Sequence, residues 1–244
     1  MIAVLVALKK EIEPFLEQLQ NVSRKRDAEC TFWEGLFCEV HVRVIATGIG
    51  GEPATDVLRG FPAIVSTGFC GALQDDVHTG DIVVARSVAY ADRKLIARIL
   101  HPDSNGGLFE GSGIFDVEMD GELLNSLQGG PGRSALKIRN GRTVTCARPL
   151  RNAGEKEKLG RYFDALSVDM EDYFRLRIAR QLGAQIFCAR AVLDEKDDTI
   201  PSLRSGLKPG KTASLLGKVP SAQQSVSLML KVIIPALVKK IDIA

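Results

Sequence analysis

Hydrophobic and polar residues follow one another along this chain in a pattern that predicts strands alternating with helices. Strand-like runs, either short and apolar or alternating, occupy residues 2–8, 38–46, 63–66, 81–89, 142–146, 165–168 and 185–192. Helical periodicity occupies residues 10–19, 154–163, 170–182 and 222–241, and another helix is expected after Pro53. This order is typical of an α/β fold, a three-layer α/β/α sandwich with a mostly parallel mixed central sheet.

Glycine and proline mark the boundaries of these elements. Gly183 is expected to cap the helix over 170–182, and Pro235 predicts a break or kink in the last helix. Glycine-rich segments at 101–120 and 129–132 are expected to be loops. Because no linker, repeat or low-complexity tract interrupts the pattern, we expect a single domain over residues 1–244.

The composition excludes several classes of protein. A net charge of +2 is too balanced for a broad nucleic-acid-binding face, and the basic residues 24–26 are expected to form a solvated loop. Five irregularly spaced cysteines predict neither a disulfide framework nor a zinc site, and no metal or other cofactor is expected. The apolar start is too short for a signal peptide, and no run approaches the ~20 apolar residues of a membrane span. We therefore expect a cytoplasmic protein with no membrane span.

Candidate chemistry lies just after the predicted strands, where ligands bind in open α/β sheets. Three carboxylates, Glu11, Glu171 and Asp194, fall at such positions, together with glycine turns at 48–51 and 68–71. Each acid alone has an ordinary explanation: Glu11 and Glu171 could complement helix starts, and Asp194 could be an N-cap. The turn at 48–51 is no dinucleotide fingerprint, because that motif needs glycine where this chain has Pro53. This disfavours an oxidoreductase that binds a dinucleotide.

Taken together, these segments resemble a known family. The matching motifs are VALKKEI (6–12), ATGIG (46–50), STGFCGAL (66–73), GDIVVA (80–85), SVDMED (167–172) and CARAVLDEKDD (188–198). In this order they resemble the purine nucleoside phosphorylase and uridine phosphorylase superfamily. Within it they are most similar to methylthioadenosine/S-adenosylhomocysteine nucleosidases and to hopanoid-associated members. The stretch from about residue 92 to 141 matches poorly.

The resemblance implies roles for individual residues. Glu11 matches the acid that activates the attacking water, and Asp194 matches the acid that protonates or hydrogen-bonds the purine at N7. Glu171 matches the carboxylate that binds the ribose hydroxyls, with Met170 packing on the sugar. Further substrate-binding positions are expected at Phe69, Gly71, Pro149 and Leu150, the last two across a one-residue gap. Family members are commonly homodimers or larger homo-oligomers, and the expected partner is a small nucleoside.

The chemistry of glycosidic cleavage calls for such carboxylates independently of the resemblance. Cleavage builds positive charge on the sugar and negative charge on the leaving base, so an acid beside the base neutralises it as it leaves. That acid must hold its proton near neutral pH, and burial is expected to raise the pKa of Asp194. A carboxylate on the ribose diol favours the developing cation. Cys70 and Cys146 lie near these loops and are expected to be inert buried thiols.

Two residues depart from the family pattern. Phe69 stands where a small residue is usual, and Leu193 replaces a serine before the acid. A phenyl ring fills space and cannot donate a hydrogen bond to phosphate, which argues against phosphorolysis or else for a reshaped nucleophile site. Phe69 could equally be a core residue that points away from the site. The sequence therefore predicts a purine nucleosidase, and the resemblance implies a preference for adenine nucleosides. The alternatives are a phosphate-dependent nucleoside phosphorylase, acting on an adenosyl-hopanoid for example, and a catalytically silent nucleoside-binding protein.

Overall fold

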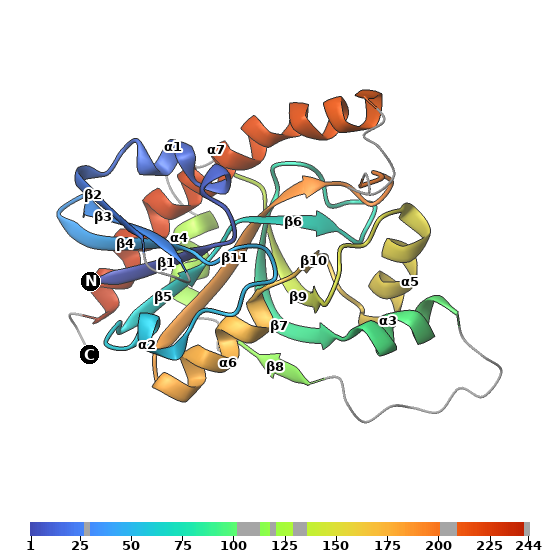
Figure 1. The fold of residues 1–244 in the computed structure, drawn as a ribbon, viewed down its shortest axis with the longest axis horizontal. Helices are drawn as coiled ribbons and strands as arrows, with labels where there is room; N and C mark the ends of the chain where they lie inside the picture. Colours follow the sequence, from blue (N-terminus) through green and yellow to red (C-terminus); the bar gives the residue numbers. More distant parts are fainter. Residues whose placement is uncertain (27–29, 102–112, 118–120, 129–135, 201–208, 242–244) are drawn as a thin grey trace.

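The computed structural model describes residues 1–26, 30–101, 113–117, 121–128, 136–200 and 209–241. Within this part of the chain, helices surround one 11-stranded mixed sheet (Figure 1). The strands are β1 (Ile2–Val6), β2 (Gln20–Arg26), β3 (Thr31–Phe37), β4 (Val40–Ala46), β5 (Ala63–Ser66), β6 (Phe69–Ala72), β7 (Ile82–Ala91), β8 (Ile114–Asp116), β9 (Ile138–Cys146), β10 (Ser167–Asp169) and β11 (Gln185–Asp194). The helices are η1 (Lys9–Glu11), α1 (Glu13–Leu16), α2 (Thr55–Leu58), α3 (Arg93–Leu100), α4 (Gly121–Gln128), α5 (Ala153–Phe163), α6 (Asp172–Leu182) and α7 (Pro209–Ile241).

The sheet has the order β2-β3-β4-β1-β5-β11-β6-β10-β9-β7-β8. Strands β4, β1, β5 and the first half of β11 are parallel neighbours, as are β6 with β11 and β10 with β9. Strand β11 also pairs antiparallel with β7, so β11, β6, β10, β9 and β7 form a closed circuit of strand pairings. Ala191 is the crossing point, since it pairs with both Phe69 and Ile82. Much of the sheet is therefore parallel, and one half of it closes on itself.

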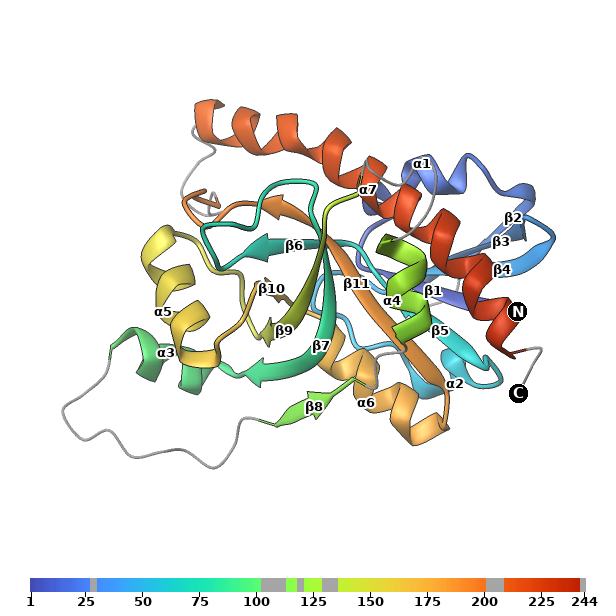
Figure 2. The ribbon, with the colours of Figure 1, turned by 180° about the vertical axis from the view of Figure 1, so that it is seen from behind.

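Helices cover both faces of this sheet (Figures 1 and 2). Helix α7 runs along one face with α1 and α4 beside it, and α2 and α6 cover the other face. Helices α3 and α5 pack together against the closed half. The largest apolar cluster joins β1, β4, β7 and β11 to α7, where Val226, Leu230 and Ile233 are fully buried. The three-layer arrangement predicted from the sequence is confirmed.

The first third of the chain departs from the expected elements. The helix predicted over 10–19 is instead the short η1 followed by α1, because Pro14 lies at the start of a new helix rather than within a continuing one. The basic residues 24–26 belong to strand β2 and not to a loop, although every side chain of β2 is solvent-exposed. Strand β2 pairs antiparallel with β3, a strand that the sequence reasoning did not identify.

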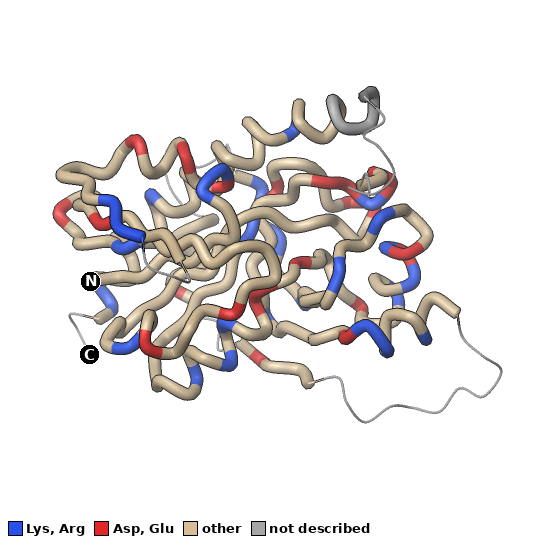
Figure 3. Tube along the Cα trace, in the orientation of Figure 1, with Lys and Arg blue, Asp and Glu red and all other residues tan. Residues whose placement is uncertain are grey.

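The middle of the chain is only partly described. Of the loop predicted at 101–120, residues 102–112 and 118–120 lie outside the described residues, and Ile114–Asp116 form a strand at the edge of the sheet. The break predicted at 129–132 also lies outside the described residues. Where the structure describes the chain, charged residues of both signs are dispersed over the trace (Figure 3), which agrees with the balanced net charge.

Helix α7 is longer than expected and changes one prediction. It begins at Pro209 and runs without a break through Pro220 and Pro235, since tertiary packing overrides the local effect of these prolines. An 18-residue window within its segment Ser214–Ile241 has a mean hydropathy of 1.3, so by length and composition alone the helix is apolar enough to cross a membrane. The apolar runs of this helix are each short, as the sequence indicated, and it is the average over the window that reaches the range of a membrane-spanning helix. Half of this window is buried inside the molecule, as in a core helix. That the chain has no membrane span stays a prediction.

Candidate active site

The three acids singled out in the sequence follow the carboxyl ends of three different strands. Glu11 ends η1 just after β1, Glu171 follows β10, and Asp194 is the last residue of β11. Their exposed fractions are 6%, 3% and 5%, respectively. Carboxylates are almost never buried to this extent without partners, so the partners of each acid determine what it can do.

Glu11 is held by three backbone N–H groups. Its Oε2 accepts hydrogen bonds from Ala7 and Leu8, both 2.8 Å long, and its Oε1 accepts one from Phe69 at 2.9 Å. The carboxylate lies so close to Gly68 that a Cβ there would sit 2.7 Å from Oε1, and Gly68 also has φ = +133°. Burial raises the pKa of Glu11, although Arg190 and the backbone donors oppose the shift. The result is a fixed carboxylate with an increased affinity for a proton.

Glu171 binds the turn at residues 48–51. Its Oε1 accepts a 2.8 Å hydrogen bond from the Gly50 N–H, and its Oε2 lies 3.1 Å from Arg190 Nη1. Gly50 has φ = +65°, and a Cβ on it would lie 3.6 Å from the terminal methyl of Met170. The structure therefore brings Met170 and Glu171 to the same turn.

Arg190 connects Glu171 to Glu11. It lies on β11 and pairs with Asp172 through Nε at 2.9 Å and Nη2 at 2.7 Å. Its Nη1 donates to the carbonyl oxygen of Phe69, whose N–H binds Glu11. Asp172 is 2% exposed and accepts a further hydrogen bond from the Ser66 hydroxyl. Two of the predicted acids thus belong to one buried network that the sequence reasoning did not identify.

Asp194 lies against β6 on the other side of the glycine turn. The register of β11 shifts between Val192 and Asp194, and a Cβ on the facing Gly71 would lie 2.7 Å from Asp194 Oδ2. The Lys156 ammonium, which has no exposed surface, lies 2.6 Å from the same oxygen. Burial raises the pKa of Asp194, as expected, while Lys156 opposes the shift. Lys156 too was missed.

The two ends of the short segment 68–71 therefore face two different acids. Glu11 lies against Gly68 and Phe69, whereas Asp194 lies against Gly71, three residues further on. Three residues of extended chain span about 10 Å. The structure brings Glu11, Glu171, Asp194, Met170 and this segment together.

The side chains of the two residues that depart from the family pattern pack elsewhere. Phe69 and Leu193 are half-buried against the main apolar cluster. Phe69 contributes only its backbone N–H and C=O to the network around Arg190. Of the two positions expected in a base pocket, Leu150 is buried in the apolar cluster under α3 and α5, and Pro149 is exposed beside it.

A further acid, Asp169, shares this region. Its Oδ1 accepts three hydrogen bonds of 2.8–2.9 Å, from the Thr145 hydroxyl and from the N–H groups of Glu171 and Asp172. Its Oδ2 is buried and has no partner among the described residues. Burial, together with the nearby charges of Asp172 and Glu171, raises the pKa of Asp169 to about 7.

The sequence contained signals for some of the residues that were missed. Arg190 is a charge in the middle of an otherwise apolar strand, which is unusual without a buried partner. Lys156 lies at helical spacing from Leu159 and Phe163, on the buried face of α5. Nothing in the sequence indicates which acids these two cations meet.

The nearby cysteines have no sign of reactivity. Cys70 and Cys146 are buried, and burial raises the pKa of both thiols. Among the described residues, no group of three or more His, Cys, Asp or Glu side chains could hold a metal ion.

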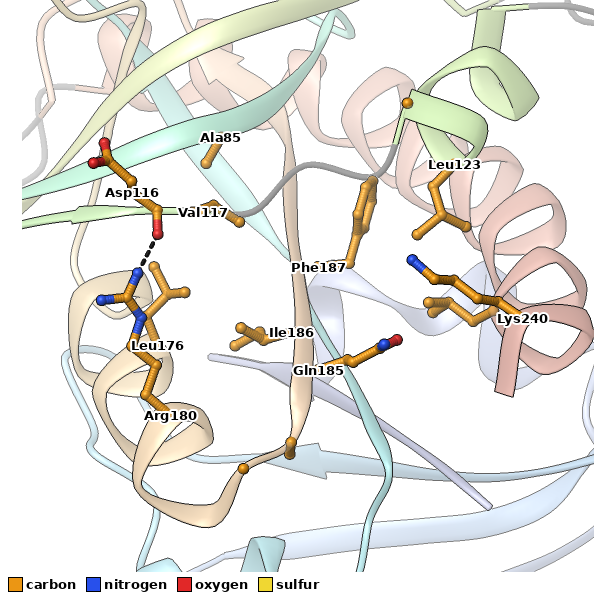
Figure 4. A pocket seen from close by; sticks show the side chains of 14 residues that line it. Ala85, Asp116, Val117, Leu123, Leu176, Arg180, Gln185, Ile186, Phe187 and Lys240 are labelled. Atoms are coloured by element: carbon orange, nitrogen blue, oxygen red, sulfur yellow. Dashed lines mark hydrogen bonds between the residues drawn. The ribbon is translucent and has the colours of Figure 1, made fainter. Parts of the chain in front are cut away.

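A separate cavity of about 880 Å³ lies at the opposite end of β11 (Figure 4). Gln185, Ile186 and Phe187 line it, with Arg180 at its edge donating to the carbonyl oxygen of Asp116. About 30 Å of strand separates Gln185 from Asp194. The cavity is therefore not part of the acid cluster.

Comparison with known proteins identifies the family of this chain. Residues 1–214 match the phosphorylase superfamily. A 5'-methylthioadenosine/S-adenosylhomocysteine nucleosidase from Halalkalibacterium halodurans is 31% identical over 97 residues, which cover 37% of this chain and only 42% of that relative. An aminodeoxyfutalosine nucleosidase from Campylobacter jejuni is 26% identical over 200 residues, covering 80% of this chain and 85% of the relative.

The fold has similar solved structures. One is the 5'-methylthioadenosine/S-adenosylhomocysteine nucleosidase from Neisseria meningitidis in complex with methylthio-immucillin-A. It has a TM-score of 0.72 at 19% identity and covers 96% of this chain and 98% of that one. At this identity the likeness concerns the fold.

Proposed function

The chain belongs to the phosphorylase superfamily, and we propose that it is a nucleosidase that hydrolyses the N-glycosidic bond of an adenine nucleoside or 5'-substituted adenosine. The observation that carries the proposal is the arrangement of Glu11, Glu171 and Asp194. These buried acids lie at the carboxyl ends of three strands, and each is connected to the short segment 68–71 directly or through Arg190.

Each acid has a distinct part in the proposed reaction. Glu11 takes a proton from the water that attacks the anomeric carbon, and its raised pKa suits it to this task. Glu171 binds the ribose hydroxyls and stabilises the positive charge that develops on the sugar. Asp194 gives a proton to the departing base. The length of segment 68–71, about 10 Å for three residues of extended chain, is comparable to that of a sugar and its base.

The contacts of Glu11 favour water over phosphate as the nucleophile. The Phe69 N–H, a donor that an incoming anion could use, is already occupied by Glu11 Oε1 at 2.9 Å. A phosphate placed there would lie against a carboxylate, and like charges at such a distance repel strongly in a buried site. The contacts of Glu11 therefore disfavour a phosphorylase on the same scaffold.

The names of the relatives support the proposed substrate class. The relatives described above act on 5'-methylthioadenosine, S-adenosylhomocysteine or aminodeoxyfutalosine, according to their names. In this chain, the groups that would select the 5' substituent are not among the contacts of the three acids. The proposal therefore names a substrate class, adenosine and its 5'-substituted derivatives.

A base-release assay tests the proposed function. The substrates are 5'-methylthioadenosine, S-adenosylhomocysteine, adenosine and inosine, each with and without phosphate. We expect phosphate-independent release of adenine and free sugar, and a loss of about 10²–10⁴-fold in Asp194→Asn, because its general acid is removed. Glu157→Gln, on the exposed side of α5, is the matched control and should keep the wild-type rate.

The other outcomes of this assay separate the alternatives. Release that requires phosphate and yields a sugar phosphate would identify a phosphorylase. Binding of adenosine without any release would identify a silent nucleoside-binding protein. An Asp194→Asn variant with near-wild-type activity would remove Asp194 from the mechanism.

We further propose that the protein forms a homo-oligomer. Two apolar side chains at the edge of the acid cluster are unusually exposed: Leu8, beside Glu11, at 44%, and Ile49, beside Gly50, at 63%. Contact with another chain would remove the apolar surface of both side chains from water, which favours association. A second copy of the chain is the occupant that we propose for this surface.

A further inference from the structure

Lys156 and Asp194 form a buried ion pair in the candidate site. Lys156 has no exposed surface, and its Nζ lies 2.6 Å from Asp194 Oδ2. The same Nζ donates to the carbonyl oxygens of Glu195 and Asp198. All the observed contacts of this ammonium are thus with Asp194 and the segment that follows it.

This contact conflicts with the simplest role for Asp194. A general acid must carry a proton when the base departs, yet an ammonium in direct contact favours the ionised carboxylate. Burial acts in the opposite direction and raises the pKa of Asp194. The pair as a whole holds one transferable proton, whichever of its two members carries it.

Building on the proposed function, we infer that Lys156 is a positioning residue that keeps Asp194 ionised in the resting site and supplies the proton that Asp194 passes to the leaving base. As the glycosidic bond breaks, its electron pair stays with the base, which takes a proton from Asp194. Asp194 takes one from the ammonium, and Lys156 is left as a neutral amine. Water bonds to the anomeric carbon and gives its proton to Glu11. The cycle closes when Glu11 loses this proton to solvent and the pair regains one through Asp194, since Lys156 has no exposed surface of its own.

The other ionisable groups near the pair are engaged elsewhere. Cys70 on β6 is uncharged, because burial raises the pKa of its thiol. Burial works to raise the pKa of Asp198, but the hydrogen bonds from Lys218 and from the Glu195 N–H hold it below its usual value. The carboxylate of Glu195 accepts from the Thr79 hydroxyl and N–H, and it also faces Lys218 on α7 and His78. Lys156 is therefore the cation in direct contact with Asp194.

Two measurements test the inference, and the first needs no substrate. Protein labelled with ¹³C at the aspartate carboxyl groups is titrated by NMR, and the Asp194 signal is assigned by its loss in Asp194→Asn. We expect an ionised Asp194 near neutral pH in the wild type. In Lys156→Met the midpoint should rise by about 1–3 pH units, because the opposite charge is gone. Lys156→Arg, which keeps the charge, should titrate like the wild type.

The matched control lies on the same helix. Lys158→Met removes another α5 lysine, whose ammonium donates to the carbonyl oxygen of Leu100 and does not contact Asp194. It should leave the Asp194 titration unchanged. A protonated Asp194 near neutral pH in the wild type would overturn the inference even if Lys156→Met failed to fold, and so would an unchanged midpoint in a folded Lys156→Met.

The second measurement is the alkaline limb of the pH profile of kcat for base release. If Lys156 supplies the proton, the pair can still donate a proton at a pH where a lone carboxylic acid has already lost its own. Lys156→Met removes this supply and should therefore move the alkaline limb to lower pH. If Asp194 acted alone, the same variant would raise its pKa and move the limb to higher pH. If Lys156 had only a structural role, its replacement would lower the melting temperature and leave the alkaline limb in place. A limb that moves to higher pH, or one that does not move, would contradict the inference.

Failure of the inference can be distinguished from failure of the proposed function. A wild-type chain that releases no base from any of the four nucleosides contradicts the function, and the NMR titration still decides whether Lys156 sets the ionisation of Asp194.

Discussion

Arg190 is the residue on which the charges of the candidate site converge. It faces the carboxylates of Asp172 and Glu171 directly, with 3% of its own surface exposed. The desolvation cost of such a group is large, and it is offset only because nearly every donor finds an acceptor. Removing one partner would leave an uncompensated buried charge, which typically costs about 3–5 kcal/mol. Arg190 therefore fixes the geometry of the acids at the same time as it neutralises them.

Asp169 gives the site a pH-dependent stability. An unfolded aspartate has a pKa of about 3.9, whereas burial and the charges of Asp172 and Glu171 raise the pKa of Asp169 to about 7. The folded state thus holds this proton more tightly than the unfolded state. The stabilisation is complete below the unfolded pKa and is lost as the pH rises through the folded pKa.

Asp169→Asn should remove this dependence, because an amide does not ionise and still offers an oxygen to the three donors. We expect the melting temperature of the variant, relative to wild type, to be higher near pH 8 than near pH 5. Asp56→Asn, at an exposed aspartate that pairs with Arg59, is the control and should show no such change. If the difference in melting temperature between the variant and the wild type were the same at both pH values, Asp169 would not be the group that ionises.

At the scale of residues, sequence reasoning found groups at strand ends but not their buried counter-charges. Glu11, Glu171 and Asp194 were found because chain order places them after strands. The pattern over residues 154–163 predicts a helix, but it does not show that Lys156 is buried, because the side of a helix that meets the core depends on where that helix packs. Contacts of Lys156 with Asp194 or of Arg190 with Asp172 join separate elements, so spacing along the chain could not reveal them.

At the scale of elements, β11 brings most of the site together. It pairs with β5, β6 and β7, and it carries both Arg190 and Asp194. Its apolar sequence predicted a buried strand correctly, and the Gly183 cap of the preceding helix was confirmed by φ = +66°. The antiparallel pairing with β7 was not predictable, because local pattern does not specify which strands become neighbours.

The short elements were the least predictable from sequence. The sequence predicted a glycine turn at the position of strand β6, because a strand of four residues is too short for its periodicity to be detected. Strands β2 and β3 form an antiparallel pair at the edge of the sheet, where β2 is fully exposed and thus lacks an apolar pattern. Helix α2 is a single turn that follows Pro53 as expected.

The proposed oligomer depends on the turn at residues 48–51. Ile49→Asp places a charge on the exposed apolar side chain of this turn and should shift the sedimentation velocity profile from an oligomer toward a monomer. The control is Leu216→Asp, which places the same charge on an exposed apolar side chain of α7 and should not alter the sedimentation profile. A wild-type chain that sediments as a monomer would contradict the proposal.

At the scale of the whole molecule, the sheet separates two regions. The acids gather where β1, β10 and β11 end, whereas the cavity of about 880 Å³ opens at the beginning of β11 (Figure 4). Ligands of α/β folds bind at the carboxyl ends of strands, so the region of the acids, and not this cavity, is where we expect the substrate. The sandwich architecture followed from the alternation of strands and helices, but the closure of one half of the sheet did not.

The account as a whole requires that these acids act on one bond. The most direct test is the rate of adenine release from 5'-methylthioadenosine, in phosphate-free buffer, by the wild type and by Glu11→Gln. The account predicts that the wild type releases adenine and that Glu11→Gln, folded as judged by circular dichroism, is slower by about 10²–10⁴-fold. A Glu11→Gln variant as fast as the wild type, or a wild type that releases no base, would contradict it.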